Sequence, residues 1–225
     1  MEASPLLEET NVDLLLSESE LAARRDHIVE FIADIVDDAG AEGAVLGLSG
    51  GIDSTTTAYL AVEALGADGL HGLLMPSEVN ADADETDAER VAEALGIEYD
   101  VIDINPVVDS FVEAAPDGDQ AVDCNPIGNL YKCQVRQLAR QLGVPEDLVT
   151  RTPTAGMWEG QTDEAEMGLG YDEVDAILAL HVDGPFSKSA TRRTLDISEE
   201  AIERVAELYE QSKHKRAMPP APDPL

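Results

Sequence analysis

The sequence predicts an α/β fold built around a doubly wound parallel sheet. Two short apolar runs, at 44–48 and 70–75, and a third run with alternating acids, at 97–104, are typical of strands. Helical periodicity separates each run from the next, and strand–helix–strand alternation favours right-handed crossovers between parallel strands. At 225 residues the chain fits one such domain, or a domain with a helical extension.

The first predicted helix lies at the N-terminal side of these runs, within residues 18–40. Apolar residues recur there at helical spacing to about residue 38. Ser17 followed by Glu20 matches a capping box, in which each side chain accepts a hydrogen bond from the other residue's backbone.

Two further helices connect the three strands. The first follows a Ser/Gly loop at 49–54 and continues to about Leu65, and the second begins near Asp82. With the strands they form a predicted βαβ core at 44–115.

The remainder of the chain is predicted to be mainly helical, over residues 118–216. Helical periodicity recurs in three segments, at 128–142, 171–181 and 198–212. The proline-rich end at 217–225 is predicted to be disordered. No internal repeat or interdomain linker is visible, so residues 1–225 are predicted to form a single domain.

The charge balance limits the possible partners. The chain has 47 acidic and 14 basic residues, a formal net charge of −33, which argues against nucleic acid or an anionic membrane as a partner. The acids are dispersed over most segments, which indicates a salt-adapted protein, although an ordinary acidic protein is the alternative.

The cellular compartment is predicted from cysteines and hydropathy. Cys124 and Cys133 lack metal-ligand spacing and are too few for a disulfide framework. No apolar run approaches the ~18 residues of a spanning helix, and the N-terminus has no basic region typical of a signal peptide. We therefore expect a cytoplasmic protein.

The most specific motif lies between the first predicted strand and the next helix. It reads Gly47-Leu48-Ser49-Gly50-Gly51-Ile52-Asp53-Ser54. Small residues let backbone N–H groups approach an anion, and a helix N-terminus adds partial positive charge, so the loop is a candidate phosphate site. Asp53 would then face the phosphates through Mg²⁺. A glycine-rich turn capped by an aspartate, with no ligand, is the alternative.

This loop resembles the SGGxDS signature of the PP-loop ATP pyrophosphatases, which cleave ATP to AMP and pyrophosphate. From about residue 20 to 218 the chain resembles the ammonia-dependent NAD synthetases within that group. The matching strings include Met75-Pro76-Ser77, Ile102-Asp103-Ile104-Asn105-Pro106, Asn129-Leu130-Tyr131-Lys132, Pro153-Thr154-Ala155-Gly156-Met157-Trp158 and His214-Lys215-Arg216.

The resemblance implies a Rossmann-like three-layer α/β/α fold of the adenine nucleotide alpha hydrolase-like type. It also implies an ATP-dependent ligase that forms NAD from deamido-NAD and free ammonia, and a homodimer. The implied roles are these: residues 47–54, Lys132 and Thr154 bind ATP, Asp53 binds Mg²⁺, Asp119 and Lys132 are catalytic, and Asp123, His214 and Lys215 contact deamido-NAD.

Each role has a structural alternative. Lys132 could be a solvated cation on a helix. Asp119 and Asp123 could form turns, a frequent role of aspartate. His214 and Lys215 could complement the C-terminal dipole of the last helix.

One stretch of the family pattern is missing between Glu113 and Gly118. Relatives carry there a strand that lies beside strand one, a Glu that binds Mg²⁺ and a Lys. Its absence would leave strand one at the edge of the sheet. A real deletion, a faulty gene sequence, and an unobserved loop closed up in the sequence are all consistent with the gap. A real deletion would predict weak or absent activity and aggregation.

Two other functions fit parts of the sequence. One is another PP-loop ligase, similar to GMP synthetase or a tRNA thiolase, although the acidic surface and the absence of a CxxC motif disfavour the thiolase. The other is a nucleotide-binding remnant that the deletion has inactivated.

Overall fold

The computed structural model describes residues 13–75, 81–102, 124–153, 162, 164 and 167–211. These residues fall into two compact units. The sheet unit contains the described residues from Leu15 to Glu166, and the helical unit contains residues 13–14 and 167–211. The assignment of residues 1–225 to a single domain stays a prediction.

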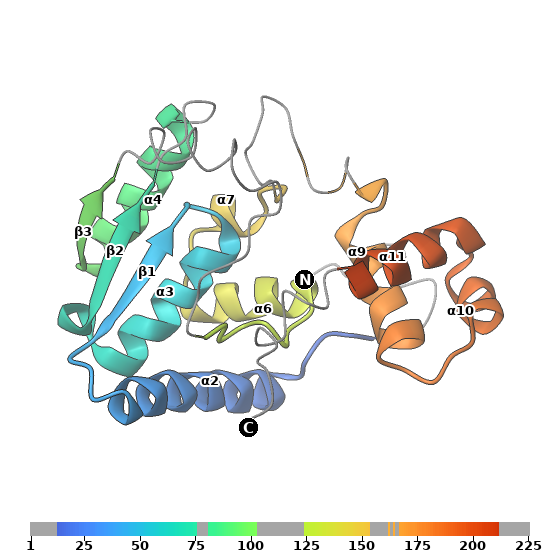
Figure 1. The fold of residues 1–225 in the computed structure, drawn as a ribbon, viewed down its shortest axis with the longest axis horizontal. Coiled ribbons are helices and arrows are strands. Elements are labelled where there is room, and N and C mark those ends of the chain that lie inside the picture. The colour runs from blue at the N-terminus through green and yellow to red at the C-terminus, as the bar shows by residue number, and fades with distance from the viewer. Residues whose placement is uncertain are drawn as a thin grey trace, which may run out of the picture. The chain divides into compact units, whose positions relative to one another are not determined.

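The sheet unit is built on a parallel three-stranded sheet (Figure 1). Its strands are β1 (Ala44–Leu48), β2 (Leu70–Leu74) and β3 (Glu98–Val101), in the order β1-β2-β3. The register places Leu46 beside Gly72, and Gly72 beside Tyr99. The predicted parallel α/β fold is confirmed, and the third strand is shorter than the predicted 97–104.

The crossover helices connect these strands as predicted. Helix α3 (Ile52–Leu65) contacts both β1 and β2, and a short 3₁₀ turn, η1 (Ala67–Gly69), leads from it into β2. Helix α4 (Ala81–Leu95) packs on β2 before the chain enters β3. Consecutive strands are therefore joined by helices, which is the connection that parallel pairing requires.

Helix α2 (Glu18–Asp38) begins at the predicted capping box. The Ser17 hydroxyl accepts a hydrogen bond from the Glu20 N–H at 3.4 Å, and the Glu20 carboxylate accepts one from the Ser17 N–H at 2.9 Å. The hydrogen bonds from Ser17 lower the pKa of Glu20. One face of the helix buries Leu21, Ile28 and Ile32, so the helical periodicity of the sequence corresponds to the core-facing side.

Helix α6 (Lys132–Leu142) and the short α7 (Glu146–Val149) complete the sheet unit. The amide of the buried Gln137 in α6 donates to the carbonyl of Leu16 at 3.0 Å and accepts from its N–H at 2.9 Å. This pairing satisfies a buried polar side chain and fixes the segment before α2.

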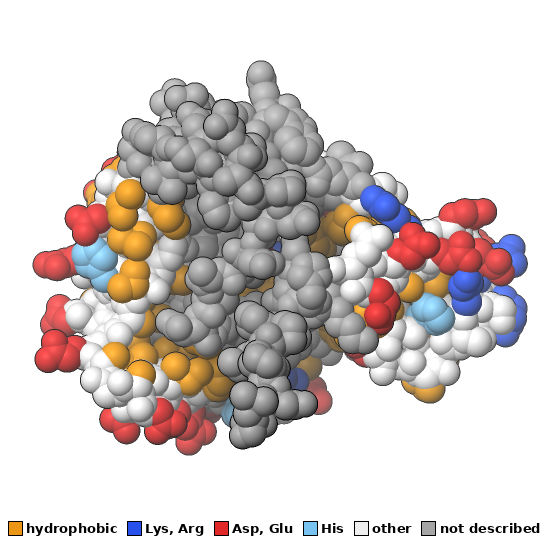
Figure 2. All heavy atoms as spheres, viewed as in Figure 1, with side chains coloured by type: hydrophobic (Ala, Val, Ile, Leu, Met, Phe, Trp, Pro, Cys, Tyr) orange, Lys and Arg blue, Asp and Glu red, His pale blue; other side chains and the backbone are white. Residues whose placement is uncertain are grey.

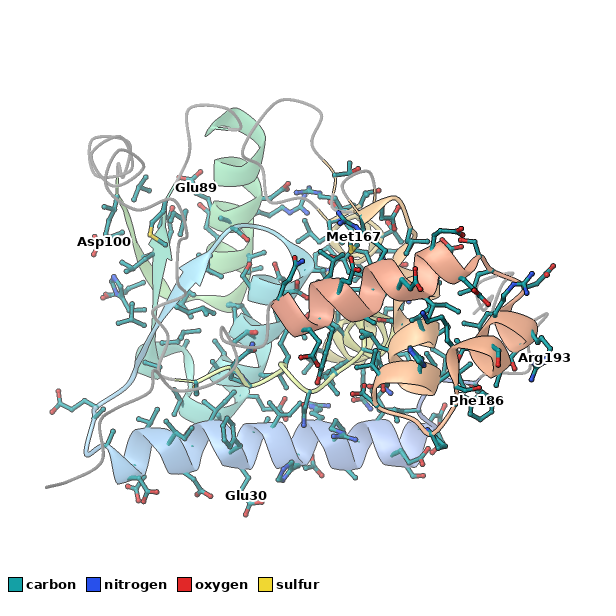
Figure 3. The ribbon with its side chains drawn as sticks, turned by 45° about the vertical axis from the view of Figure 1, so that its right-hand side comes forward. Glu30, Glu89, Asp100, Met167, Phe186 and Arg193 are labelled. Atoms are coloured by element: carbon teal, nitrogen blue, oxygen red, sulfur yellow. The ribbon has the colours of Figure 1, made fainter. Side chains whose placement is uncertain are left out.

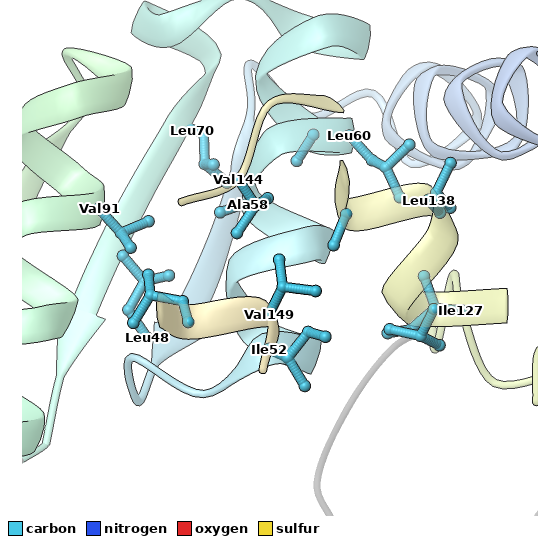
Figure 4. Close-up of a cluster of buried hydrophobic side chains, with 14 of the residues drawn as sticks. Leu48, Ile52, Ala58, Leu60, Leu70, Val91, Ile127, Leu138, Val144 and Val149 are labelled. Atoms are coloured by element: carbon cyan, nitrogen blue, oxygen red, sulfur yellow. The ribbon is translucent and has the colours of Figure 1, made fainter. Parts of the chain in front are cut away.

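The core of the sheet unit lies between α3, the sheet and α6. Figure 4 shows side chains from all three, together with Val144 and Val149 from the chain after α6. Leu60, Leu74, Leu138 and Leu148 are fully buried there. Each fully buried leucine contributes roughly 1.5–3 kcal/mol relative to an exposed one.

The helical unit consists of four consecutive elements: α9 (Tyr171–Ile177), the π-helical turn η2 (Leu178–Val182), α10 (Lys188–Leu195) and α11 (Glu199–Gln211). Its core contains Ala176, Ile177, Leu195, Ile202 and Val205. The predicted helices at 171–181 and 198–212 are confirmed, the first with a π-helical end.

Helix α10 was absent from the sequence prediction. Only Thr191 and Leu195 of its eight residues are buried, which is too short an apolar pattern to reveal a helical period. Figure 3 shows Arg193 directed away from the ribbon, on the exposed side. The helix is set instead by its N-cap, where the Ser187 hydroxyl accepts from the Ala190 N–H at 3.3 Å.

Acidic side chains lie on the surface of both units (Figure 2). Basic side chains are fewer, as the composition requires. Across the described ranges, every helix is too short or too polar to cross a bilayer.

The close approach of Gly43 to Gly69, just before β1 and β2, generates a stability prediction. A Cβ atom added at Gly43 would lie 2.5 Å from the Gly69 carbonyl oxygen, which is backbone and cannot rotate away. We expect Gly43→Ala to lower the free energy of unfolding by about 2 kcal/mol, a typical cost of overpacking. Chemical denaturation measures this free energy of unfolding. Glu42→Ala is the matched control, since Glu42 is exposed, and an equal loss in both variants would contradict the prediction.

Candidate functional site

The loop between β1 and α3 carries the predicted phosphate motif. Gly50 has a φ of +73°, a left-handed conformation that glycine adopts without steric cost. Gly51 is the N-cap of α3 and provides no side chain to the helix end. The first N–H groups of a helix have no partner within the helix. The loop therefore presents backbone donors at a point of partial positive charge, as phosphate binding requires.

Two serine hydroxyls tie this loop together. The Ser49 and Ser54 hydroxyl oxygens are 3.1 Å apart, and the Ser54 hydroxyl donates to the Gly51 carbonyl at 3.2 Å. The Ser49 hydroxyl in turn accepts from the Gly51 N–H at 3.3 Å. These bonds hold the loop in a defined shape.

Two glycines of the motif, Gly47 and Gly51, lie close to neighbouring side chains. A Cβ atom at Gly47 would lie 3.1 Å from Met75 Cε, and a Cβ at Gly51 would lie 3.3 Å from the Ser49 hydroxyl. Larger residues would crowd the end of β1 and the turn that follows. Close packing therefore favours small residues at these two positions, whereas Gly50 is favoured by its positive φ.

Lys132 and Asp53 meet beside the loop, although 79 positions separate them in the sequence. The Lys132 ammonium donates to both carboxylate oxygens of Asp53, at 2.9 and 2.6 Å. Asp53 belongs to the first turn of α3 and Lys132 is the first residue of α6, so the two helices present their N-termini to one place. The structure brings together two of the predicted site residues.

The ion pair is unevenly buried. The Lys132 side chain is 11% exposed and the Asp53 side chain is 54% exposed. The ammonium is therefore largely removed from water, whereas solvent reaches the carboxylate. A cation placed in this way can neutralise an anion bound at the loop.

Helix α6 begins four residues later than the predicted 128–142. Two turns precede it, in which the Gly128 N–H donates to the Asn125 carbonyl and the Leu130 N–H to the Ile127 carbonyl, both at 3.1 Å. The late start places Lys132 at the helix end instead of in its second turn. Gln134 accepts from the Tyr131 N–H at 3.2 Å and stabilises this start.

Sequence reasoning missed a second charged cluster in the sheet unit. Asp87 on α4 is 8% exposed, pairs with Arg151 and lies 3.5 Å from the Arg90 guanidinium. Arg90 also donates to Asp147 at 2.6 Å, and this hydrogen bond lowers the pKa of Asp147 and raises that of Arg90. The cluster fixes the chain at Arg151, three residues before the predicted ATP ligand Thr154. No local spacing signals a pair 64 residues apart.

The other predicted site residues lie outside the described part of the chain. These are Asp119, Asp123, Thr154, His214 and Lys215. Their roles stay predictions, and the loop with Asp53 and Lys132 is the part of the site that the structure describes.

The donor set at the loop suits a metal that arrives with a phosphate ligand. Within the described ranges, no group of three or more His, Cys, Asp or Glu side chains could hold a metal by itself. Mg²⁺ is usually held by one or two carboxylates, substrate phosphates and water. The exposed Asp53 carboxylate beside the loop fits that pattern.

Comparison with known proteins identifies the family of the chain. The family model described as NAD synthase matches residues 25–117 and 116–219. The NH(3)-dependent NAD(+) synthetase of Halobacterium salinarum is 52% identical over 94% of this chain and 97% of its own length. The enzyme of that name from Hyperthermus butylicus is 40% identical over 88% of this chain and 89% of its own.

Solved structures show the same fold. The NMN synthetase of Francisella tularensis has a TM-score of 0.73 and 29% identity, covering 90% of this chain and 98% of its own. The NH3-dependent NAD synthetase of Campylobacter jejuni has a TM-score of 0.67 and 22% identity, covering 90% and 99%, and supports the fold alone.

The matches also locate the missing segment. The two stretches of the family match meet at residues 116–117, beside the expected gap between Glu113 and Gly118. The alignment with the Halobacterium protein extends over 259 positions, more than the 225 residues of this chain, so that relative has residues without a counterpart here. With nearly the whole chain matched on both sides of the gap, the protein belongs to the NAD synthase family.

Proposed function

We propose that this protein amidates deamido-NAD with ammonia at the expense of ATP, giving NAD, AMP and pyrophosphate. The observation that carries the proposal is the pairing of Lys132 and Asp53 beside the Ser/Gly loop, in a chain 52% identical to an NH(3)-dependent NAD(+) synthetase. The amide-forming reaction needs ATP because a free carboxylate is a poor electrophile.

The first step transfers the adenylyl group of ATP. A nicotinate carboxylate oxygen attacks the α-phosphorus, the bond to the bridging oxygen breaks, and pyrophosphate leaves as an NAD-adenylate forms. The loop N–H groups and Lys132 hold the polyphosphate and offset its growing negative charge. Asp53 would hold Mg²⁺, and the metal would supply further neutralisation of the charge on the pyrophosphate.

The second step forms the amide. The nitrogen of ammonia attacks the activated acyl carbon, AMP leaves with the electron pair of the acyl–oxygen bond, and the nitrogen loses a proton. We assign to Asp119 the positioning or deprotonation of ammonium. Thr154 is assigned to ATP, and Asp123, His214 and Lys215 to deamido-NAD; the family resemblance supports these five roles.

The setting of the enzyme follows from its charge and composition. We propose a homodimer in the cytoplasm of a salt-adapted cell, with Mg²⁺ as the metal. The net charge of −33 supports the salt adaptation, and the family resemblance supports the dimer.

A second candidate differs only in the size of the substrate. The Francisella relative is named for making NMN, so a nicotinate mononucleotide is an alternative acceptor of the amide nitrogen. The same loop, Lys132 and Asp53 would serve ATP in either case.

The reaction itself is tested by product analysis. With Mg-ATP, ammonium and deamido-NAD in about 1 M KCl, we expect AMP and NAD to form in equal amounts, and only when deamido-NAD is present. Turnover should be slow, since the family segment with a further Mg²⁺-binding Glu is missing. Chromatography measures the amounts of AMP and NAD and the rate at which they form. A folded chain that binds ATP and releases no AMP would support the inactivated remnant, and NMN formed from the mononucleotide would support the second candidate.

The role of Lys132 is tested through ATP affinity, which does not depend on turnover. We expect Lys132→Gln to weaken Mg-ATP binding by at least about tenfold, the loss of one charge-assisted hydrogen bond. Isothermal titration calorimetry measures the dissociation constant. Lys188→Gln is the matched control, because Lys188 pairs with Glu203 in the helical unit. Equal affinity in the Lys132 variant and the wild type would exclude a phosphate contact.

Salt adaptation is tested by thermal unfolding. Raising KCl from about 0.1 M to 1 M shortens the screening length from ~10 Å to ~3 Å, which weakens repulsion among the surface carboxylates. We expect the melting temperature to rise by about 10 °C or more over this range. A solution of sucrose at equal osmolality is the control, and a rise of the same size there would assign the effect to solvent exclusion instead of charge screening.

A further inference from the structure

The Asp53 carboxylate already has a cation, and that cation is the Lys132 ammonium. We infer that Lys132 keeps divalent metal off Asp53 until ATP binds, and that the phosphates then draw Lys132 away and leave Asp53 to the metal. The inference rests on the proposed function of this loop in binding Mg-ATP. It adds an order of events at the site.

The contact geometry supports exclusion of a metal. The ammonium lies 2.9 Å from one carboxylate oxygen and 2.6 Å from the other, so it occupies the position between them that a metal bound to both oxygens would take. A divalent ion approaching either oxygen would also meet a like charge at short range. Such repulsion is strong at a partly buried site.

The burial of the two partners determines which of them can leave. Lys132 is 11% exposed, and burial makes a charge costly unless opposite charge lies close to it, so negative charge beside the ammonium stabilises it. Asp53 is 54% exposed and can be solvated by water. The phosphates of ATP would lie at the loop beside Lys132, and their negative charge can replace that of Asp53 next to the ammonium.

The placement of Lys132 has no benefit for its own helix. It is the first residue of α6, where the helix dipole disfavours a cation, and the first turn of α6 contains no acidic residue. A residue that breaks a local rule is expected at a functional site. Asp53, at the N-terminus of α3, is in contrast well placed for the dipole.

The exchange keeps every charge paired. Before ATP binds, Asp53 pairs with Lys132. Afterwards, Lys132 would donate to phosphate oxygens, and Asp53 would be available to hold the metal. A metal without nucleotide would find Asp53 already neutralised, in a part of the chain where the described residues include no group of three or more His, Cys, Asp or Glu side chains that could hold a metal.

Binding of Mn²⁺, a paramagnetic substitute for Mg²⁺, tests the inference without nucleotide. Free Mn²⁺ is followed by electron paramagnetic resonance in about 1 M KCl, which screens the other surface carboxylates. We expect Lys132→Met and Lys132→Gln to gain a Mn²⁺ site at least about tenfold tighter than any in the wild type. Lys132→Arg, which keeps the charge, should resemble the wild type. Circular dichroism confirms the fold of each variant.

The double variant Lys132→Met/Asp53→Asn tests whether the new Mn²⁺ site lies at Asp53. We expect it to bind Mn²⁺ no more tightly than the wild type does. Equal Mn²⁺ binding by the wild type and both neutral variants would overturn the inference, as would a gain that persists in the double variant. The measurement does not depend on NAD formation, so an enzyme that fails to make NAD can still show exclusion of Mn²⁺ by Lys132, and an active enzyme can fail to show it.

Discussion

Packing around helix α3 fixes the part of the molecule on which the site depends. The helix contacts β1 and β2 and also packs against α2 and α6. Ala58 and Leu60 are completely buried, and Figure 4 shows Leu60 of α3 in the same cluster as Leu138 of α6. A helix held by several neighbours cannot rotate without breaking a dense core. Its first turn, and with it Asp53, therefore has a defined position relative to the N-terminus of α6.

Local sequence patterns predicted most of this frame. A few adjacent residues suffice to predict each of three features: the Ser17–Glu20 capping box, the first two strands and the loop at 49–54. Their structure follows from hydrogen bonds and periodicities of short range, which a single sequence displays. The family resemblance then selected Lys132 and Lys215 from among four lysines, a choice that no periodicity could make.

The features that sequence did not predict depend on distant partners. The start of α6 is set by turns around Gly128, and helix α10 shows too few buried residues to produce a period. The pairing of Asp87 with Arg151 joins α4 to the chain beyond α7. Such contacts depend on how helices pack, so they become visible only in three dimensions. The uneven exposure of Lys132 and Asp53 also depends on the packing of distant helices, and it determines which of the two charges solvent can reach.

The position of β1 has a consequence for the behaviour of the protein in solution. In the described part of the chain β1 pairs with β2 alone, and its sequence, Ala-Val-Leu-Gly-Leu, contains no charge. Val45 is 66% exposed. β3, at the other side of the sheet, carries Glu98 and Asp100, the kind of charges that protect an edge. Repulsion between molecules of charge −33 keeps two uncharged edges apart at low ionic strength.

The same salt that relieves repulsion within one molecule also removes it between molecules, because both act through the same screening length. Folding and colloidal stability thus place opposite demands on ionic strength. Salt that favours folding therefore also favours association, and within the described residues the uncharged strand β1 is the edge at which two molecules would pair.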